Sequence, residues 1–157
     1  MAFKPGIDAF FARNSGNWAT PTWVEIEIVE ELTPGTGWET ADIKTRQSPV
    51  KFGAKTMLDM GFTVRVLCDD TDAGYTALMT AFQSKTATMD LLVLDGPNTV
   101  NGSFGVRAMF QVAEGAQPQP VDAPLYREFK CIPYPDVNNR PQFANVVNSN
   151  LTFTTIT

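Results

Sequence analysis

The feature that most constrains the fold is a regular alternation of apolar and polar residues, the pattern of β-strands with one buried face. It is longest in Met57–Leu67 and recurs in Trp23–Leu32. In the first segment the apolar positions are Leu58, Met60, Phe62, Val64 and Val66, opposite Asp59, Thr63 and Arg65. In the second they are Val24, Ile26 and Ile28, opposite Glu25 and Glu27. We expect each segment to form one strand.

Four further segments are prone to form strands. They are Thr88–Leu94, Ser103–Val112, Leu125–Ile132 and Leu151–Thr157. The turn signals Asp95-Gly96-Pro97 and Asn101-Gly102 separate the first two, which predicts an antiparallel hairpin.

Only Thr71–Lys85 has helical spacing. Its apolar stripe consists of Tyr75, Leu78, Met79 and Phe82. Such a stripe packs on a sheet, and Asp70 or Thr71 is expected to cap the helix N-terminus. We therefore expect a mainly β (α+β) fold, an antiparallel β-sandwich or half-open barrel with one helix, about residues 71–85, packed against it.

The 157 residues are expected to form one domain in which three segments have weak periodicity. They are an N-terminal arm (1–18), a long loop (33–52) and a C-terminal extension (134–157). The loop is longer than a compact domain usually tolerates without a functional reason. The two terminal segments are expected to form no core of their own, and either to dock on a neighbouring copy or to stay loose.

The absence of histidine excludes several reaction classes. Without imidazole there is no Ser-His-Asp or Cys-His nucleophile pair, and two cysteines cannot complete a four-ligand zinc site. Cys68 and Cys131 are interpreted as small buried residues, although a bridge is open if their strands pair. The sequence shows no signal peptide or membrane span, so we expect synthesis and folding in a cytoplasm, with no membrane partner.

The acidic residues suggest no cofactor, metal or catalytic site. Asp69, Asp70 and Asp72 fail the spacing of a calcium loop, so they are interpreted as helix-capping residues. Glu25, Glu27 and Asp59 could serve a glycosidase, but a solvated acidic face is the preferred interpretation. The net charge of −5 argues against tight binding of a nucleic-acid backbone.

The order of elements resembles the major tail tube proteins of tailed bacteriophages. The resemblance covers about Trp18 to Pro135 and rests on TWVEIEIVEEL, a long loop, MLDMGFTVRVLCDD, the helix DAGYTALMTAFQSK and the strand TMDLLVLDG. Its most telling part is AGYTALMTAF followed by LLVLDG. The extension Tyr134–Thr157 departs from the simpler family pattern.

This resemblance implies a structural virion protein and not an enzyme. Hexameric rings would stack into a hollow tail tube through which DNA passes, an architecture shared with the tubes of contractile injection systems. The implied partners are further copies of the chain, a tape-measure protein, DNA in the lumen and, in sheathed tails, a sheath protein. Its location would be the virion tail, after assembly in the host cytoplasm.

Two sets of assembly residues follow as expectations. Glu25, Glu27 and Asp59 are candidates for the lumen lining, where negative charge would repel DNA phosphates. Arg65 and Arg107, also on polar strand faces, would weaken that field. In the loop, Trp38, Arg46 and Phe52 are candidates for contact with the next ring.

Two alternatives remain. A tail terminator or tube cap, which forms a single ring, fits the same features. A soluble carbohydrate-binding β-sandwich would keep the strands and need an aromatic platform on a rigid surface.

Overall fold

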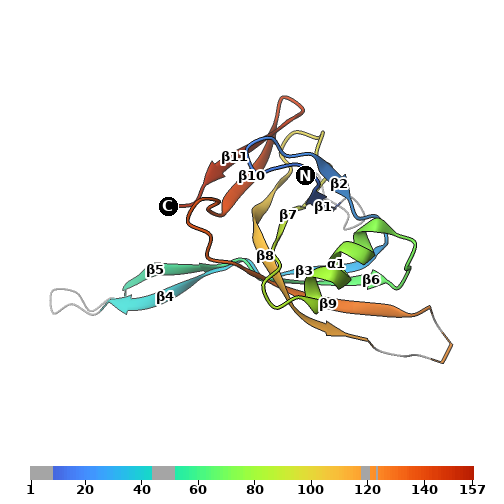
Figure 1. The fold of residues 1–157 in the computed structure, drawn as a ribbon. Coiled ribbons are helices and arrows are strands. Elements are labelled where there is room, and N and C mark those ends of the chain that lie inside the picture. The colour runs from blue at the N-terminus through green and yellow to red at the C-terminus, as the bar shows by residue number, and fades with distance from the viewer. Residues whose placement is uncertain (1–8, 44–51, 118–120, 123) are drawn as a thin grey trace.

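The computed structural model describes residues 9–43, 52–117, 121–122 and 124–157. They form a body of antiparallel strands with one helix and a projecting hairpin (Figure 1). In chain order the elements are β1 (Phe10–Asn14), β2 (Trp23–Glu25), β3 (Val29–Pro34), β4 (Gly37–Ile43), β5 (Phe52–Asp59), β6 (Phe62–Leu67), α1 (Ala73–Gln83), β7 (Met89–Leu94), β8 (Phe104–Ala116), β9 (Tyr126–Pro133), β10 (Gln142–Val147) and β11 (Asn150–Thr155).

A nine-stranded antiparallel sheet organises the body, in the order β2-β1-β7-β8-β9-β6-β3 with the hairpin β10–β11 attached to β8. The long strand β8 connects the different parts of the sheet. One of its edges pairs with β7, whereas the other pairs first with β10 and then with β9. Within the described chain the end strands β2 and β3 do not pair with each other, so the sheet stays open. The predicted antiparallel sandwich with one helix is confirmed, and no closed barrel forms.

Helix α1 lies beside the strands of the body (Figure 1). Its apolar stripe packs against the main core. Leu78 is fully buried and Tyr75 is nearly so, with its ring 6.2 Å from that of Phe129. Met79 and Phe82 are half-buried against the same core. The helix N-cap is Asp72, not Asp70 or Thr71 as predicted, because the Asp72 carboxylate accepts a 3.0 Å hydrogen bond from the Tyr75 amide.

A second core lies on the other face of β1 and β7, where the hairpin β10–β11 covers them. It contains Phe10, Ala12, Leu92, Leu94, Ala144 and Val146. The terminal segments 1–18 and 134–157 therefore contribute to a core, which they build together with Leu92 and Leu94 of β7 and not on their own. Strand β1 lies inside the sheet with both faces covered, and β10 buries alternate residues against it.

The long strand predicted over Met57–Leu67 is interrupted, because β5 ends at Asp59 and β6 begins at Phe62. At the interruption the Asp59 carboxylate accepts a 2.9 Å hydrogen bond from the Gly61 amide. The Gly35 amide in turn donates to the Gly61 carbonyl over 2.9 Å, and a Cβ on Gly35 would come within 2.9 Å of that oxygen. Gly35 therefore has to be a glycine, at the point where the two paired segments of the hairpin leave the body.

Two further sequence predictions need correction. The segment Trp23–Leu32 forms the short strand β2 and the start of β3, which lie at opposite ends of the sheet order, and not one strand. The predicted loop 33–52 instead contains the end of β3 and all of β4, which pairs with β5. A strand exposed on both faces has no alternation to reveal it, which is why β4 was predicted to be loop.

Candidate functional site

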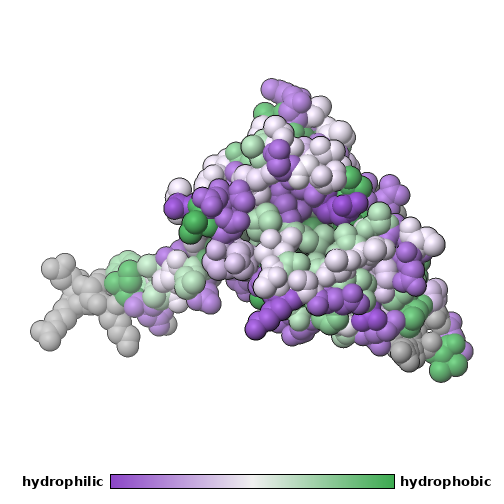
Figure 2. Space-filling model, in the orientation of Figure 1, coloured by the Kyte–Doolittle hydropathy of each residue, from purple (hydrophilic) through white to green (hydrophobic). Residues whose placement is uncertain are grey.

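The hairpin β4–β5 projects away from the body (Figure 1). Apolar side chains lie exposed along it, as Figure 2 shows. Met57 is 68% exposed, and Ile43, Phe52 and Trp38 are 47%, 46% and 38% exposed. Ile43 and Phe52 are cross-strand partners, and the Lys55 ammonium lies 5.5 Å from the centre of the Trp38 ring.

Such a hairpin is a strong candidate for an interaction surface. A two-stranded hairpin without further packing is marginally stable in water, and exposed apolar side chains that cluster mark contact sites. Of the three residues predicted to contact a neighbouring ring, Trp38 and Phe52 lie on this hairpin. Arg46 lies outside the described residues.

A second candidate surface is the exposed side of the layer formed by β3, β6, β9 and the end of β8, here called the polar face. The strand register defines it, because Val64 pairs with Phe129 toward the core while the next residues, Thr63 and Lys130, pair on the outside. The charged residues of the polar face are Glu30, Glu31, Arg65, Glu114, Glu128 and Lys130. Four carboxylates and two cations give it a net charge of −2.

The two cations of the polar face are partnered. Arg65 Nε lies 3.0 Å from Glu30 Oε2, and its guanidinium lies 5.3 Å from the centre of the Tyr126 ring. Lys130 Nζ lies 3.9 Å from Glu114 Oε1. No such ion pair exists for Glu31 or Glu128 among the described residues. The polar face therefore presents a weakly negative surface.

A third candidate is a groove of about 760 Å³ between the β1–β2 edge and β3, here called the seam groove. Its apolar lining is Phe11, Ile26, Val29 and Leu32, with Ala9 beside them. Its acidic lining is Glu25, Glu27, Glu30 and Glu31. The groove lies where the open sheet leaves two strands unpaired, and such edges are frequent docking sites.

The three residues predicted to line the lumen lie at two different sites, the seam groove and the base of the hairpin. Glu25 and Glu27 are exposed and line the seam groove. Asp59 lies at the base of the hairpin, where it binds the Gly61 amide, and does not line the groove. The structure therefore does not bring the three carboxylates together.

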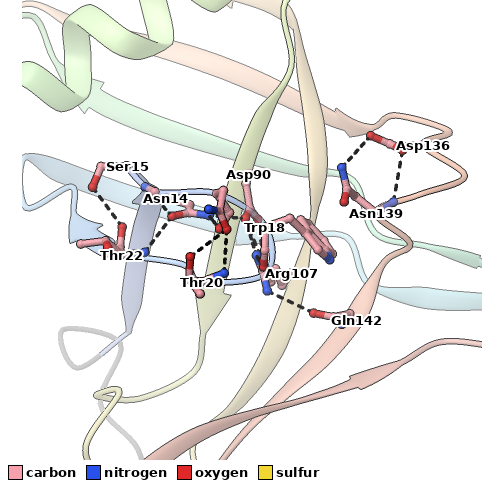
Figure 3. Close-up of polar contacts among 12 residues, drawn as sticks. Asn14, Ser15, Trp18, Thr20, Thr22, Asp90, Arg107, Asp136, Asn139 and Gln142 are labelled. Carbon is pink, nitrogen blue, oxygen red and sulfur yellow. Dashed lines mark hydrogen bonds and ion pairs between the residues drawn. The ribbon is translucent and has the colours of Figure 1, made fainter.

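Arg107 was expected on a polar strand face, but it is buried. Its guanidinium donates to Asp90, to the Trp18 carbonyl over 2.9 Å and to Gln142 over 3.3 Å (Figure 3). The Trp18 ring stacks on it at 3.8 Å, with the rings of Phe153 and Trp23 at 4.8 and 5.0 Å. This cluster links the β1–β2 loop, β7, β8 and the C-terminal hairpin, so its role is structural.

The aspartates before the helix are explained by local hydrogen bonds. Asp69 accepts bonds from the Thr71 hydroxyl and amide, and these hold the pKa of its carboxyl below its usual value. Asp72 caps the helix. Among the described residues no three His, Cys, Asp or Glu side chains group in a way that could bind a metal ion.

The two cysteines are free and lie at opposite ends of the β6–β9 ladder. Cys131 pairs with Phe62, whereas the Cys68 amide donates to the Leu125 carbonyl. Six residues of strand separate the two positions, roughly 20 Å at ~3.3 Å per residue, too far for a disulfide. Burial raises the pKa of the Cys131 thiol to about 12.

The described residues contain no helix with the length and apolar character needed to cross a bilayer. The polar face and the seam groove were not predicted. Their signals were present in the sequence, as Glu128 and Lys130 alternating with buried Phe129 and Cys131, and as the glutamates 25, 27, 30 and 31. Only the strand order shows which of these residues meet.

No known protein-family model matches the sequence, and no curated protein is significantly similar to it. Solved structures are similar in fold. The SPP1 tail tube protein aligns with a TM-score of 0.65 at 11% identity, over 82% of this chain and 74% of that chain. A protein of the tail of an empty gene transfer agent particle with C6 symmetry aligns with a TM-score of 0.63 at 12% identity, over 98% of this chain and 100% of that chain.

A third similar structure comes from an extracellular contractile injection system. It belongs to the sheath/tube terminator of that assembly and aligns with a TM-score of 0.60 at 7% identity, over 90% of this chain and 98% of that chain. The chain therefore has the fold of tail tube proteins, as the order of its sequence elements predicted.

Proposed function

We propose that this chain is a structural, non-enzymatic virion protein whose copies form rings that stack into a hollow tail tube. The observation that carries the proposal is the projecting β4–β5 hairpin, with Trp38, Phe52 and Met57 exposed on a two-stranded ladder. Such a hairpin gains stability by packing on another molecule. The fold shared with tail tube proteins supports a further copy of the chain as that molecule.

Rings of six copies would follow the C6 symmetry of the gene transfer agent tail. The open sheet supports assembly, because contact with further copies would cover the unpaired strands β2 and β3. In this arrangement the hairpin, with Trp38 and Phe52, reaches the next ring. Arg46, which the sequence carries between β4 and β5, belongs to the same proposed contact.

The polar face is the surface that we assign to the lumen, in place of the earlier candidates Glu25, Glu27 and Asp59. It is a continuous strand surface with a net charge of −2 per copy, and its two cations are neutralised by partners. DNA phosphates would be repelled weakly and would slide without sticking. The earlier candidates lie apart from one another, at the seam groove and at the hairpin base.

The remaining partners follow from this assignment. During assembly the lumen would hold a tape-measure protein, and during genome delivery it would carry DNA. The outer surface of a contractile tail would contact a sheath protein. Assembly would take place in the host cytoplasm, and the finished protein would reside in the virion tail.

A tail terminator or tube cap is the second candidate. The similarity to the sheath/tube terminator of a contractile injection system favours it, since that protein shares the same fold. A terminator forms one ring and stops. The two functions therefore differ in whether a second ring of the same protein stacks on the first.

A carbohydrate-binding role has less support. Trp18 and Trp23 enclose the buried Arg107 guanidinium, and Trp38 is distant in the fold, on the hairpin. The three tryptophans therefore do not form a common platform for a sugar ring.

Negative-stain electron microscopy of the purified protein, with its mass measured by light scattering, tests the proposal. Long hollow tubes are the expected result. Single closed rings would favour the terminator, and a stable monomer at high concentration would contradict both virion roles.

A further inference from the structure

The seam groove carries more negative charge than its surroundings neutralise. Among the described residues, Glu30 is the one of its four glutamates that has a cation nearby, since Arg65 Nε lies 3.0 Å from it. For Glu25, Glu27 and Glu31 no ion pair exists within the described part of the chain. The floor between them is apolar, with Phe11 and Ile26 buried beneath it. An occupant of this groove should be basic and should carry some apolar surface.

The segment that joins β4 to β5, residues 44–51, has this composition. It reads KTRQSPVK, with three cations, one valine, one proline and no acidic residue. Its two ends continue from Ile43 and Phe52, which are exposed apolar residues. The segment and the residues at its two ends therefore complement the groove in charge and in apolar character.

The groove cannot be occupied by the hairpin of the same molecule. Strand β4 begins after the end of β3, and the hairpin points away from the body (Figure 1). Seven residues of β4 extend by about 23 Å at ~3.3 Å per residue, in the direction away from the sheet. A second copy is therefore the molecule that would receive the segment.

We propose that the seam groove of one copy binds the basic segment 44–51 of a second copy, with Glu25 and Glu27 facing Lys44, Arg46 and Lys51. This inference rests on the proposed function and specifies its subunit contact. The hairpin and the groove are different surfaces, so the contact is head-to-tail, and head-to-tail contacts generate closed rings or continuing stacks. Charge complementarity of this kind fixes the register and the partner.

Residues 1–8 are the competing occupant, because Ala9 lines the groove. Their side chains carry one cation, Lys4, and one carboxylate, Asp8. Their side-chain charge is therefore balanced, whereas residues 44–51 include three cations and no carboxylate. The charge of the groove favours residues 44–51.

Charge reversal with rescue tests the inference. One variant carries Glu25→Lys and Glu27→Lys, a second carries Lys44→Glu and Lys51→Glu, and a third combines all four changes. Each single-surface variant should raise the protein concentration needed for assembly at least about tenfold, because like charges would then meet across the contact. The combined variant should assemble nearly as the unchanged chain does. Circular dichroism and thermal unfolding confirm that each variant folds. Asp70→Lys combined with Asp122→Lys, at exposed positions outside the hairpin and the seam groove, serves as a control for charge alone.

Zero-length carbodiimide cross-linking identifies the occupant directly. In mixtures of isotopically heavy and light protein, Lys44 or Lys51 should link to Glu25 or Glu27 between copies of different mass. Links from Lys4 instead would mean that residues 1–8 fill the groove, and would overturn the inference.

The outcomes separate this inference from the proposed function. If tubes form but reversal of the groove charges has no effect, or if the combined variant is not rescued, the contact is wrong and the tube assignment stands. If the unchanged chain never assembles, both are wrong.

Discussion

Arg107 and Asp90 form an ion pair inside the protein, with Nη2 and Oδ2 2.6 Å apart and side chains only 3% and 8% exposed. Asp90 also accepts a 2.8 Å hydrogen bond from Asn14, and Arg107 binds the Trp18 carbonyl. The pair thus fixes the β1–β2 loop against β7 and β8 (Figure 3). Breaking such a pair leaves an unpaired charge in an environment of low polarity.

We expect Arg107→Met to lower the free energy of unfolding by about 3–5 kcal/mol, the range for removal of one partner from a buried ion pair. Urea denaturation followed by tryptophan fluorescence measures this change. The matched control is Glu114→Gln, which removes an exposed pair with Lys130 and should cost less than about 1 kcal/mol. Equal losses of unfolding free energy in the two variants would show that Arg107 does not form a buried ion pair with Asp90.

Gly105 is the second position where a small change should have a large effect. It lies in β8 between Leu94 of β7 and Ala144 of β10, and a Cβ there would collide with the Val93 carbonyl oxygen. Since that oxygen belongs to the backbone, no side-chain rotation relieves the clash. Gly105→Ala should destabilise the fold by at least the ~1–3 kcal/mol of an overpacked site.

Gly37→Ala is the control for this prediction, because a Cβ at Gly37 meets nothing within 4 Å. Thermal unfolding of the two variants should differ clearly, with Gly37→Ala close to the unchanged chain. A well-folded Gly105→Ala protein would mean that β7 and β8 are spaced differently.

The sequence predicted the strands that have one buried and one exposed face. Strand β6 is the clearest case, with Phe62, Val64 and Val66 buried and the residues between them half-exposed. Alternation exists only under that condition. In β1, Phe10, Phe11 and Ala12 are all buried because both faces are covered, and in β4 every residue is exposed. Neither strand alternates, so one was interpreted as an arm and the other as a loop.

The surfaces were harder to predict than the elements. A charged residue in an alternating strand is normally exposed, and Arg107 fits that pattern, yet the C-terminal hairpin covers it. The seam groove depends on β2 and β3 lying at opposite ends of the sheet order although they are adjacent in sequence. The order of strands in a sheet is set by pairing between segments that are distant in sequence, and local periodicity does not encode it.

Leu78 should carry most of the stabilising contact between helix and sheet. It is fully buried, and Leu→Ala at such a site typically costs about 2–5 kcal/mol. Met79, on the same stripe, is only partly buried, so Met79→Ala should cost clearly less. Denaturant unfolding of both variants measures the difference. Equal costs would mean that the helix is rotated about its axis.

Cys131 should be unreactive in the folded protein. Burial raises the pKa of its thiol from 9.0 to about 12, so at pH 8 the thiolate is about a thousandfold rarer than for an ordinary cysteine. Iodoacetamide labelling followed by mass spectrometry should modify half-buried Cys68 and leave Cys131 intact until the protein unfolds. Rapid native labelling of Cys131 would contradict its burial.

The same raised pKa gives a pH dependence of stability. The folded state keeps the Cys131 proton, whereas the unfolded chain loses it above pH 9.0. The stabilising effect is therefore complete below pH 9.0 and declines as the pH rises toward about 12. Cys131→Ser is unsuitable as a test because it changes the packing, so unfolding of the unchanged chain across this range is the measurement.

The polar face offers a test of the lumen assignment that leaves the proposed assembly contacts unchanged. Reversing Glu114 and Glu128 to lysine would change its charge from −2 to +2 per copy, since each reversal adds two positive charges. Both side chains lie away from the hairpin and from the seam groove, so tubes should still form. The altered tubes should retain DNA fragments, and retention should fall steeply as salt is raised, because phosphate contacts depend on counterion release.

Asp70→Lys combined with Asp122→Lys is the matched control, as it adds the same charge at exposed positions outside the polar face and the hairpin. Gel analysis of DNA that sediments with tubes compares the two variants at several salt concentrations. Retention by the Glu114/Glu128 variant alone would support the polar face as the lumen lining. Equal retention by both would show that total charge governs binding, and the polar face would then lose its assignment.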